Sequence, residues 1–193
     1  MDVSVYITLI AAYDAGSSGD VASLRVNLEK LEGSAMAKGW VHMSLERELA
    51  VLEAQLAKVI PMDRSWQTAD GASTTLGQVL GDGQALLLDF YASWCHPCMD
   101  AMPALAERAA QFGPKGLVVV GVNVEGDPAK ARAVREKFKL TLPWLMDTDD
   151  DSGLASLLAI EAIPYTALVS AEGKLLYLGS PESPLLAAKL DAL

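Results

Sequence analysis

The feature that most constrains this chain is a buried-strand pattern that runs into two cysteines. Residues 85–90 form a nearly unbroken apolar run, as expected of a central parallel strand that is covered on both faces. Cys95 and Cys98 follow, and from Met99 onward apolar residues recur at helical spacing. The pattern therefore predicts a strand, a short loop and a helix, with both thiols in the first turn of that helix.

The position of Cys95 predicts a reactive thiol. A cysteine at the start of a helix faces unpaired backbone N–H groups and the positive end of the helix dipole, which stabilise the thiolate and lower the thiol pKa. Cys98 lies on the same turn, at a separation that a disulfide can bridge without moving the backbone. We therefore expect Cys95 to be an exposed nucleophile and Cys98 to be the resolving thiol.

The residues around the two cysteines resemble the active-site segment of thioredoxin-fold proteins. The resemblance implies a thiol-disulfide oxidoreductase that reduces or isomerises protein disulfides without a cofactor. Its expected partners are disulfide-containing protein clients and a redox partner protein. The resemblance also implies that Pro164, which follows Ile163, is a cis proline facing the dithiol. The residues that match in order are Asp89, Phe90, Ala92, Trp94, Cys95, Pro97 and Cys98.

Other parts of the chain are similar to the TlpA-like branch of thioredoxin-fold proteins, and this resemblance implies a bacterial protein. A short hairpin with an Asp-Gly turn is expected from residue 66, ahead of the central strand. A second buried strand is predicted at 117–124, and the helix at 127–138 and the short strand at 143–146 form the insertion that TlpA-like chains carry. The fold class is therefore α/β, a thioredoxin fold with a mixed sheet of four or five strands and helices on both faces.

Asp89 and His96 are the candidate residues that tune the dithiol. Asp89 interrupts the apolar strand, and burial there would raise its pKa towards the range of a proton acceptor, although a carboxylate satisfied by a backbone partner also fits. A protonated His96 would stabilise the thiolate, although a solvated surface histidine also fits. The other residues predicted to form the active-site environment, and to contact clients, are Trp94, Pro97, Ile163 and Pro164.

No metal site is predicted. The chain has only two cysteines, and its other histidine, His42, lies far upstream, so tetrahedral zinc would lack two ligands. The acidic run at 147–151 lacks the glycine and the terminal glutamate of a calcium-binding EF-hand loop. A structural disulfide is a further alternative for the two cysteines, but the strand-turn-helix position is typical of a redox-active pair.

Two other functions compete with the dithiol oxidoreductase. A peroxidase similar to the peroxiredoxins is disfavoured, because Ala92 stands where those proteins have a threonine and Cys98 would have no role. The alternative from another class is a binding or scaffold protein whose N-terminal helices oligomerise or recruit a partner. Redox competence of Cys95 and Cys98 distinguishes these functions.

Residues 1–61 carry none of this chemistry and are predicted to form a helical region, packed as a hairpin or small bundle. Alternatively, the apolar faces of these helices form the interface of a homo-oligomer. Residues 61–65 are the predicted linker, and residues 62–193 the thioredoxin-like domain. The apolar residues that fit one face of the first helix are Tyr6, Leu9, Ile10 and Tyr13, and those of the longest are Leu45, Leu49, Leu52, Leu56 and Val59.

The net charge of -10 argues against nucleic acids and anionic membrane surfaces as partners, because both bind mainly through Lys and Arg. No apolar run approaches the ~18 residues that span a bilayer. The apolar stretch at 3–12 follows Asp2, where a signal peptide carries positive charge. We therefore expect either a cytoplasmic protein or one whose export signal was removed, and the TlpA-like resemblance implies a periplasmic or otherwise exported location.

Overall fold

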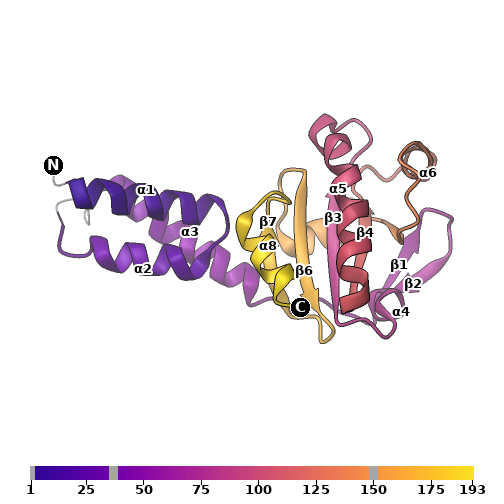
Figure 1. The fold of residues 1–193 in the computed structure, drawn as a ribbon, viewed down its shortest axis with the longest axis horizontal. Coiled ribbons are helices and arrows are strands. Elements are labelled where there is room, and N and C mark those ends of the chain that lie inside the picture. The colour runs from indigo at the N-terminus through magenta and orange to yellow at the C-terminus, as the bar shows by residue number, and fades with distance from the viewer. Residues whose placement is uncertain (1–2, 35–38, 148–151) are drawn as a thin grey trace. The chain divides into compact units, whose positions relative to one another are not determined.

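The computed structural model describes residues 3–34, 39–147 and 152–193 (Figure 1). The chain divides into two compact units, Met1–Ala57 and Lys58–Leu193. The first unit is helical and the second holds all the described strands. The helices of the first unit are α1 (Val3–Ser17), α2 (Val21–Leu31) and α3 (Trp40–Leu56).

The helical unit has its own small core. Asp20 caps α2 by accepting a hydrogen bond from the Ser23 N–H at 3.0 Å, which explains where this helix begins. The leucines of α2 and Leu45, Leu49 and Leu52 of α3 then face inward at helical spacing, as their pattern predicts. The predicted face of the longest helix is wrong at its end, because α3 ends at Leu56 and Val59 is 65% exposed. The buried residues of this core are Ala12, Ala15, Leu24, Leu28, Leu31, Leu45 and Leu52.

The inward face of α1 differs from the predicted packing face. Of the four residues grouped by spacing, only Leu9 packs against the core. Tyr6, Ile10 and Tyr13 are more than half exposed, because the inward face of α1 is formed by Ala12, Ala15 and their neighbours. A homo-oligomer through the N-terminal helices stays a prediction.

The second unit is built on one mixed sheet with the strand order β2-β1-β5-β4-β3-β6-β7. The central strand β3 (Ala85–Tyr91) is buried at every residue because it lies between β4 and β6. It runs parallel to β4 and antiparallel to β6. The other strands are β1 (Ser65–Thr68), β2 (Ser73–Thr75), β4 (Leu117–Asn123), β5 (Trp144–Met146), β6 (Tyr165–Ser170) and β7 (Leu175–Gly179).

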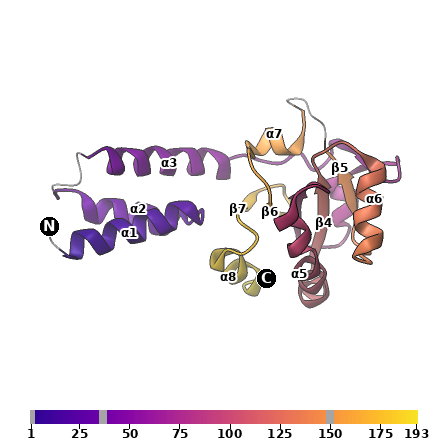
Figure 2. The same ribbon diagram turned by 90° about the horizontal axis from the view of Figure 1, so that it is seen from above.

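Helices cover both faces of this sheet. Figure 2 shows α5 and α8 on one face and α7 on the other. The predicted helix after the second buried strand is α6, capped by Asp127, whose carboxylate accepts hydrogen bonds from the N–H groups of Ala129 and Lys130. The helices of this unit are α4 (Leu76–Leu80), α5 (His96–Phe112), the 3-10 helix η1 (Gly113–Lys115), α6 (Pro128–Lys137), α7 (Leu154–Leu158) and α8 (Pro184–Asp191).

The prediction of a thioredoxin fold is confirmed, but the strand number is wrong. In the described part of the chain the sheet has seven strands instead of four or five. The hairpin of β1 and β2 precedes β3 in the chain, as predicted, and it extends the sheet by two strands because β1 pairs with β5. The insertion therefore provides the edge on which the hairpin docks.

Residues just after Ala57 belong to the second unit, so the break between units precedes the predicted linker at 61–65. Ile60 is 1% exposed, and its N–H donates to the Gly173 carbonyl at 2.8 Å. Gly173 has φ +81° and leaves no room for a Cβ beside the Ile60 carbonyl. The Lys58 ammonium also donates to the Leu157 carbonyl at 2.6 Å.

We expect a fragment that starts at Lys58 to fold, and one that starts at Met62 to be less stable by about 2–4 kcal/mol, since it loses the buried Ile60 side chain and its hydrogen bond. Urea denaturation of the two fragments measures the difference. Equal stabilities, or an unfolded Lys58 fragment, would show that the break lies elsewhere.

Candidate active site

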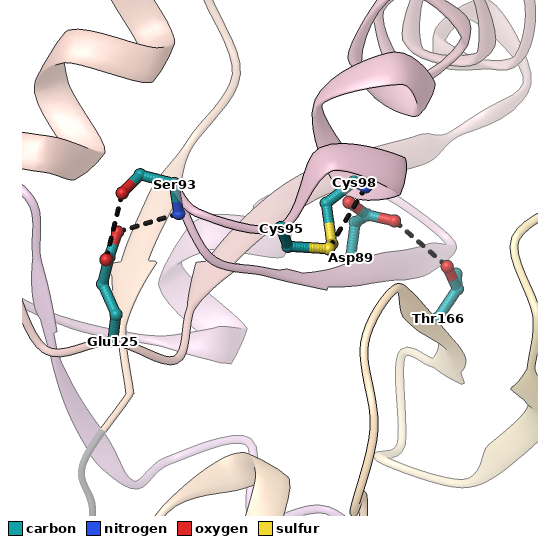
Figure 3. The surroundings of a disulfide bond; sticks show 6 residues. All are labelled: Asp89, Ser93, Cys95, Cys98, Glu125 and Thr166. Carbon is teal, nitrogen blue, oxygen red and sulfur yellow. Dashed lines mark hydrogen bonds between the residues drawn. A yellow bond between two sulfur atoms is a disulfide. The ribbon is translucent and has the colours of Figure 1, made fainter.

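The two cysteines lie where β3 passes into α5. Cys95 is the N-cap residue of α5, and its sulfur accepts a hydrogen bond from the Cys98 N–H at 3.2 Å. The two residues form a disulfide, with 5.2 Å between their Cα atoms (Figure 3). Because the Cys95 sulfur occupies the position that a serine or aspartate oxygen takes in other N-caps, the helix is arranged to stabilise negative charge on it.

The exposure that we expected for Cys95 is absent in the disulfide form. Cys95 is 4% exposed and Cys98 is 1% exposed, because the disulfide is part of the apolar core of the second unit. The residues around the pair are open instead. Trp94 is 65% exposed, and His96 and Pro97 are exposed as well. A partner therefore meets these three side chains before it reaches the sulfur.

Asp89 is buried in β3, where its strand neighbours are Gly121 and Thr166. Burial raises the pKa of its carboxyl from the usual 3.8 to about 7, and the hydrogen bond from Thr166 and the charge of Arg108 lower it by less. The Thr166 hydroxyl donates to the Asp89 carboxyl at 3.1 Å. Asp89 therefore has a side-chain partner in Thr166, and its carboxyl changes its protonation near neutral pH.

Ile163 and Pro164 lie at the start of β6, beside the end of β3, since Tyr165 is paired with Phe90. The peptide bond between Ile163 and Pro164 is cis. Ile163 and Trp94 line one hollow of about 170 Å³ on the surface of the second unit. The structure therefore brings together two of the predicted environment residues from distant parts of the sequence.

A second, larger hollow of about 660 Å³ lies between α5 and α6, and His96 and Ser93 contribute to its wall. Lys130 and Lys137 of α6 line it as well. The two hollows are lined by separate sets of residues, Ile163 and Trp94 in one and His96 and Ser93 in the other.

Ser93 and Glu125 belong to the site although we did not predict them. The Glu125 carboxylate accepts hydrogen bonds from the Ser93 N–H at 2.9 Å and from the Ser93 hydroxyl at 3.0 Å. In the view of Figure 3, this pair and the Asp89–Thr166 pair lie on opposite sides of the disulfide. Glu125 could have been predicted from the register of the two adjacent parallel strands. A single sequence does not contain that register.

Within the described ranges 3–34, 39–147 and 152–193, no group of three or more His, Cys, Asp or Glu side chains could hold a metal ion. Residues 148–151 of the acidic run lie outside those ranges. In the same described part of the chain, no helix has the length and apolar character needed to cross a bilayer.

A disulfide at the N-terminus of a helix, next to the central strand of a mixed sheet, defines the thiol-disulfide oxidoreductases of the thioredoxin fold. The sequence agrees with this class, since residues 57–178 match the model of the AhpC/TSA family. The chain belongs to that family.

The chain is similar to proteins and structures of this class, which confirms the predicted resemblance. It is 28% identical over 151 residues to the thioredoxin-like protein YneN of Bacillus subtilis, covering 76% of this chain and 83% of YneN. It is 27% identical to the thiol-disulfide oxidoreductase ResA of Bacillus subtilis, covering 48% of this chain and only 50% of ResA. A structure of a thiol-disulfide oxidoreductase from Bacteroides fragilis superposes with a TM-score of 0.61 at 25% identity, covering 70% of this chain and 98% of that chain.

Proposed function

We propose that this protein reduces or isomerises disulfides in protein clients, with Cys95 as the nucleophile and Cys98 as the resolving thiol. The observation that carries the proposal is the N-cap position of Cys95, whose sulfur accepts the Cys98 N–H while it is bonded to the Cys98 sulfur. This arrangement uses both thiols. A peroxidase, in contrast, would leave Cys98 without a part in the attack on substrate.

In the reduced protein, the Cys95 thiolate attacks one sulfur of a client disulfide and forms a mixed disulfide, while the other client sulfur leaves as a thiolate. Cys98 then loses its proton and attacks the Cys95 sulfur. This step forms the Cys95–Cys98 disulfide and releases the second client sulfur, so that two electrons pass to the client. A dithiol partner protein of lower potential must return two electrons before the next cycle.

Asp89 is proposed to accept the proton from Cys98. Its carboxyl has a pKa of about 7 and therefore takes up and releases protons at the pH at which the thiol must be activated. Burial supplies this pKa, and the Thr166 hydroxyl orients the carboxyl through its hydrogen bond. The Asp89 pair lies to the Cys98 side of the disulfide in Figure 3.

Client recognition is proposed to run over Trp94, Ile163 and Pro164. Trp94 is 65% exposed beside the disulfide, and it shares a hollow with Ile163. An apolar segment next to a client disulfide fits such a hollow. This surface would determine which client the protein binds, because the thiol chemistry is the same for every client disulfide.

The protein is proposed to work outside the cytoplasm, in the periplasm or another exported location. The TlpA-like resemblance supports this location, because a disulfide reductase or isomerase meets stable client disulfides in an oxidising compartment. Fractionation of the cells that produce the natural protein tests the location, and recovery in the cytoplasmic fraction contradicts it.

An insulin-reduction assay tests the function. With dithiothreitol as the electron source, the wild-type protein is expected to accelerate the precipitation of insulin B chains well beyond dithiothreitol alone, because the helix N–H that donates to the Cys95 sulfur would stabilise a thiolate there after reduction. A protein that folds but does not accelerate the reaction supports the alternative, a binding or scaffold protein.

A further inference from the structure

Glu125 reaches the loop before Cys95 because β3 and β4 are parallel and in register. Tyr91 at the end of β3 is paired with Asn123 at the end of β4. The Val124 N–H donates to the Tyr91 carbonyl at 3.0 Å, so the ladder continues one step beyond the strands. Two residues past each strand end the chains present Ser93 and Glu125, which therefore meet (Figure 3).

The contacts of Glu125 satisfy both of its carboxylate oxygens. Oε1 accepts from the Ser93 N–H at 2.9 Å and from the Asn123 amide at 3.3 Å. Oε2 accepts from the Ser93 hydroxyl at 3.0 Å and from the Lys130 ammonium at 3.4 Å. The Glu125 side chain is only 6% exposed, so solvent competes little for these hydrogen bonds.

Glu125 makes these contacts as an anion. Burial raises the pKa of its carboxyl, but the hydrogen bonds from Ser93, Asn123 and Lys130 together lower it further, so the pKa lies below its usual value. Hydrogen bonds to an ionised acceptor are stronger than those between neutral groups. The Ser93 backbone is therefore anchored more firmly than a neutral acceptor would hold it.

The anchored residue is two positions before Cys95. The Cys95 N–H donates to the Ala92 carbonyl at 3.1 Å, so the segment from Ala92 to Cys95 forms a tight turn with Ser93 inside it. We propose that Glu125 is a positioning residue, which holds this turn through Ser93 so that the Cys95 sulfur remains the N-cap acceptor of α5. The inference rests on the proposed role of Cys95 as the nucleophile.

A positioning role and a purely electrostatic role of Glu125 predict opposite shifts in the pKa of the Cys95 thiol. If Glu125 acts through position, its removal loosens the hydrogen bond from the Cys98 N–H to the Cys95 sulfur, and the pKa of the Cys95 thiol rises. If Glu125 acts only as a nearby negative charge, its removal makes the thiolate easier to form, and the pKa of the Cys95 thiol falls. The direction of the shift therefore distinguishes the two.

The experiment measures the alkylation rate of Cys95 against pH in the reduced full-length protein, with mass spectrometry to separate the two thiols. We expect Glu125→Ala to raise the pKa of the Cys95 thiol by about half a unit to one unit, which is what partial loss of an N-cap hydrogen bond gives. Glu125→Gln retains an acceptor for the Ser93 N–H, so its shift is expected to be smaller. It also serves as the test if Glu125→Ala does not fold.

The matched control is Glu172→Gln. Glu172 also accepts a serine hydroxyl, from Ser170 at 2.8 Å, but it lies in the turn between β6 and β7, and its replacement is expected to leave the Cys95 thiol unchanged. A folded Glu125→Ala variant with an unchanged or lowered Cys95 pKa overturns the positioning role. A wild-type protein that does not alkylate preferentially at Cys95 contradicts the proposed function itself, so the two failures are distinct.

Discussion

Replacing Cys95 by serine is expected to abolish disulfide reduction, whereas replacing Cys98 by serine is expected to stop it after the first attack. Cys95 supplies the nucleophile and the N-cap acceptor, so Cys95→Ser should lower the insulin-reduction rate by at least about 10³-fold. Cys98→Ser retains the attack but cannot resolve its product. It should therefore accumulate a mixed disulfide between Cys95 and the client.

Non-reducing electrophoresis and mass spectrometry of the peptide that contains Cys95 measure this accumulation. The two variants are each other's control, because serine replaces a buried sulfur at the same helix end in both. The assignment is contradicted if Cys95→Ser traps the client and Cys98→Ser does not, which would exchange the roles of the two thiols.

Replacing Asp89 by asparagine is expected to stabilise the protein above neutral pH and to slow its turnover. Asp89 has a pKa of about 7 in the folded protein and about 3.8 when unfolded, so between these values the folded state holds a proton that the unfolded state has lost. Stability therefore falls as the pH rises through this window, by up to about 4 kcal/mol for a shift of this size.

Asparagine does not ionise, so the variant does not lose stability as the pH rises through this window. We expect Asp89→Asn to be more stable than wild type by about 2–4 kcal/mol at pH 8, and to show little gain below pH 4, where the carboxyl is protonated in both states. The Thr166 hydroxyl can still donate to the asparagine oxygen. Urea denaturation across this pH range measures the difference.

Asp82→Asn is the matched control, since Asp82 is exposed in the turn before β3 and its replacement should change stability little. A gain for Asp89→Asn that is the same at pH 4 and pH 8 would show that packing, not titration, causes it. An unchanged rate of insulin reduction would contradict the proposed proton-accepting role.

The local elements of the site follow from the sequence because each depends on neighbouring residues. The apolar run of β3 and the helical spacing after Met99 place Cys95 at a helix start, and the structure confirms that position. The carboxyl in an otherwise apolar strand likewise predicts the raised pKa of Asp89.

The features that the sequence does not predict depend on pairing between distant segments. Glu125 contacts Ser93 because β3 and β4 share a register, and β1 joins the sheet because the short strand β5 offers it an edge. The burial of Cys95 depends on the core around it, which is built from residues of several distant segments. Periodicity within one segment contains none of this information.

The reduction potential of the Cys95–Cys98 pair tests the central claim most directly. The pair is equilibrated with glutathione buffers of known ratio, its free thiols are alkylated, and mass spectrometry gives the fraction of each form. Pro97 is typical of reducing members of the fold, whereas His96 favours a more oxidising pair. We therefore expect a potential between about -270 and -180 mV, the range of reductases and isomerases. A potential near about -120 mV, that of a dedicated oxidant, would contradict the account.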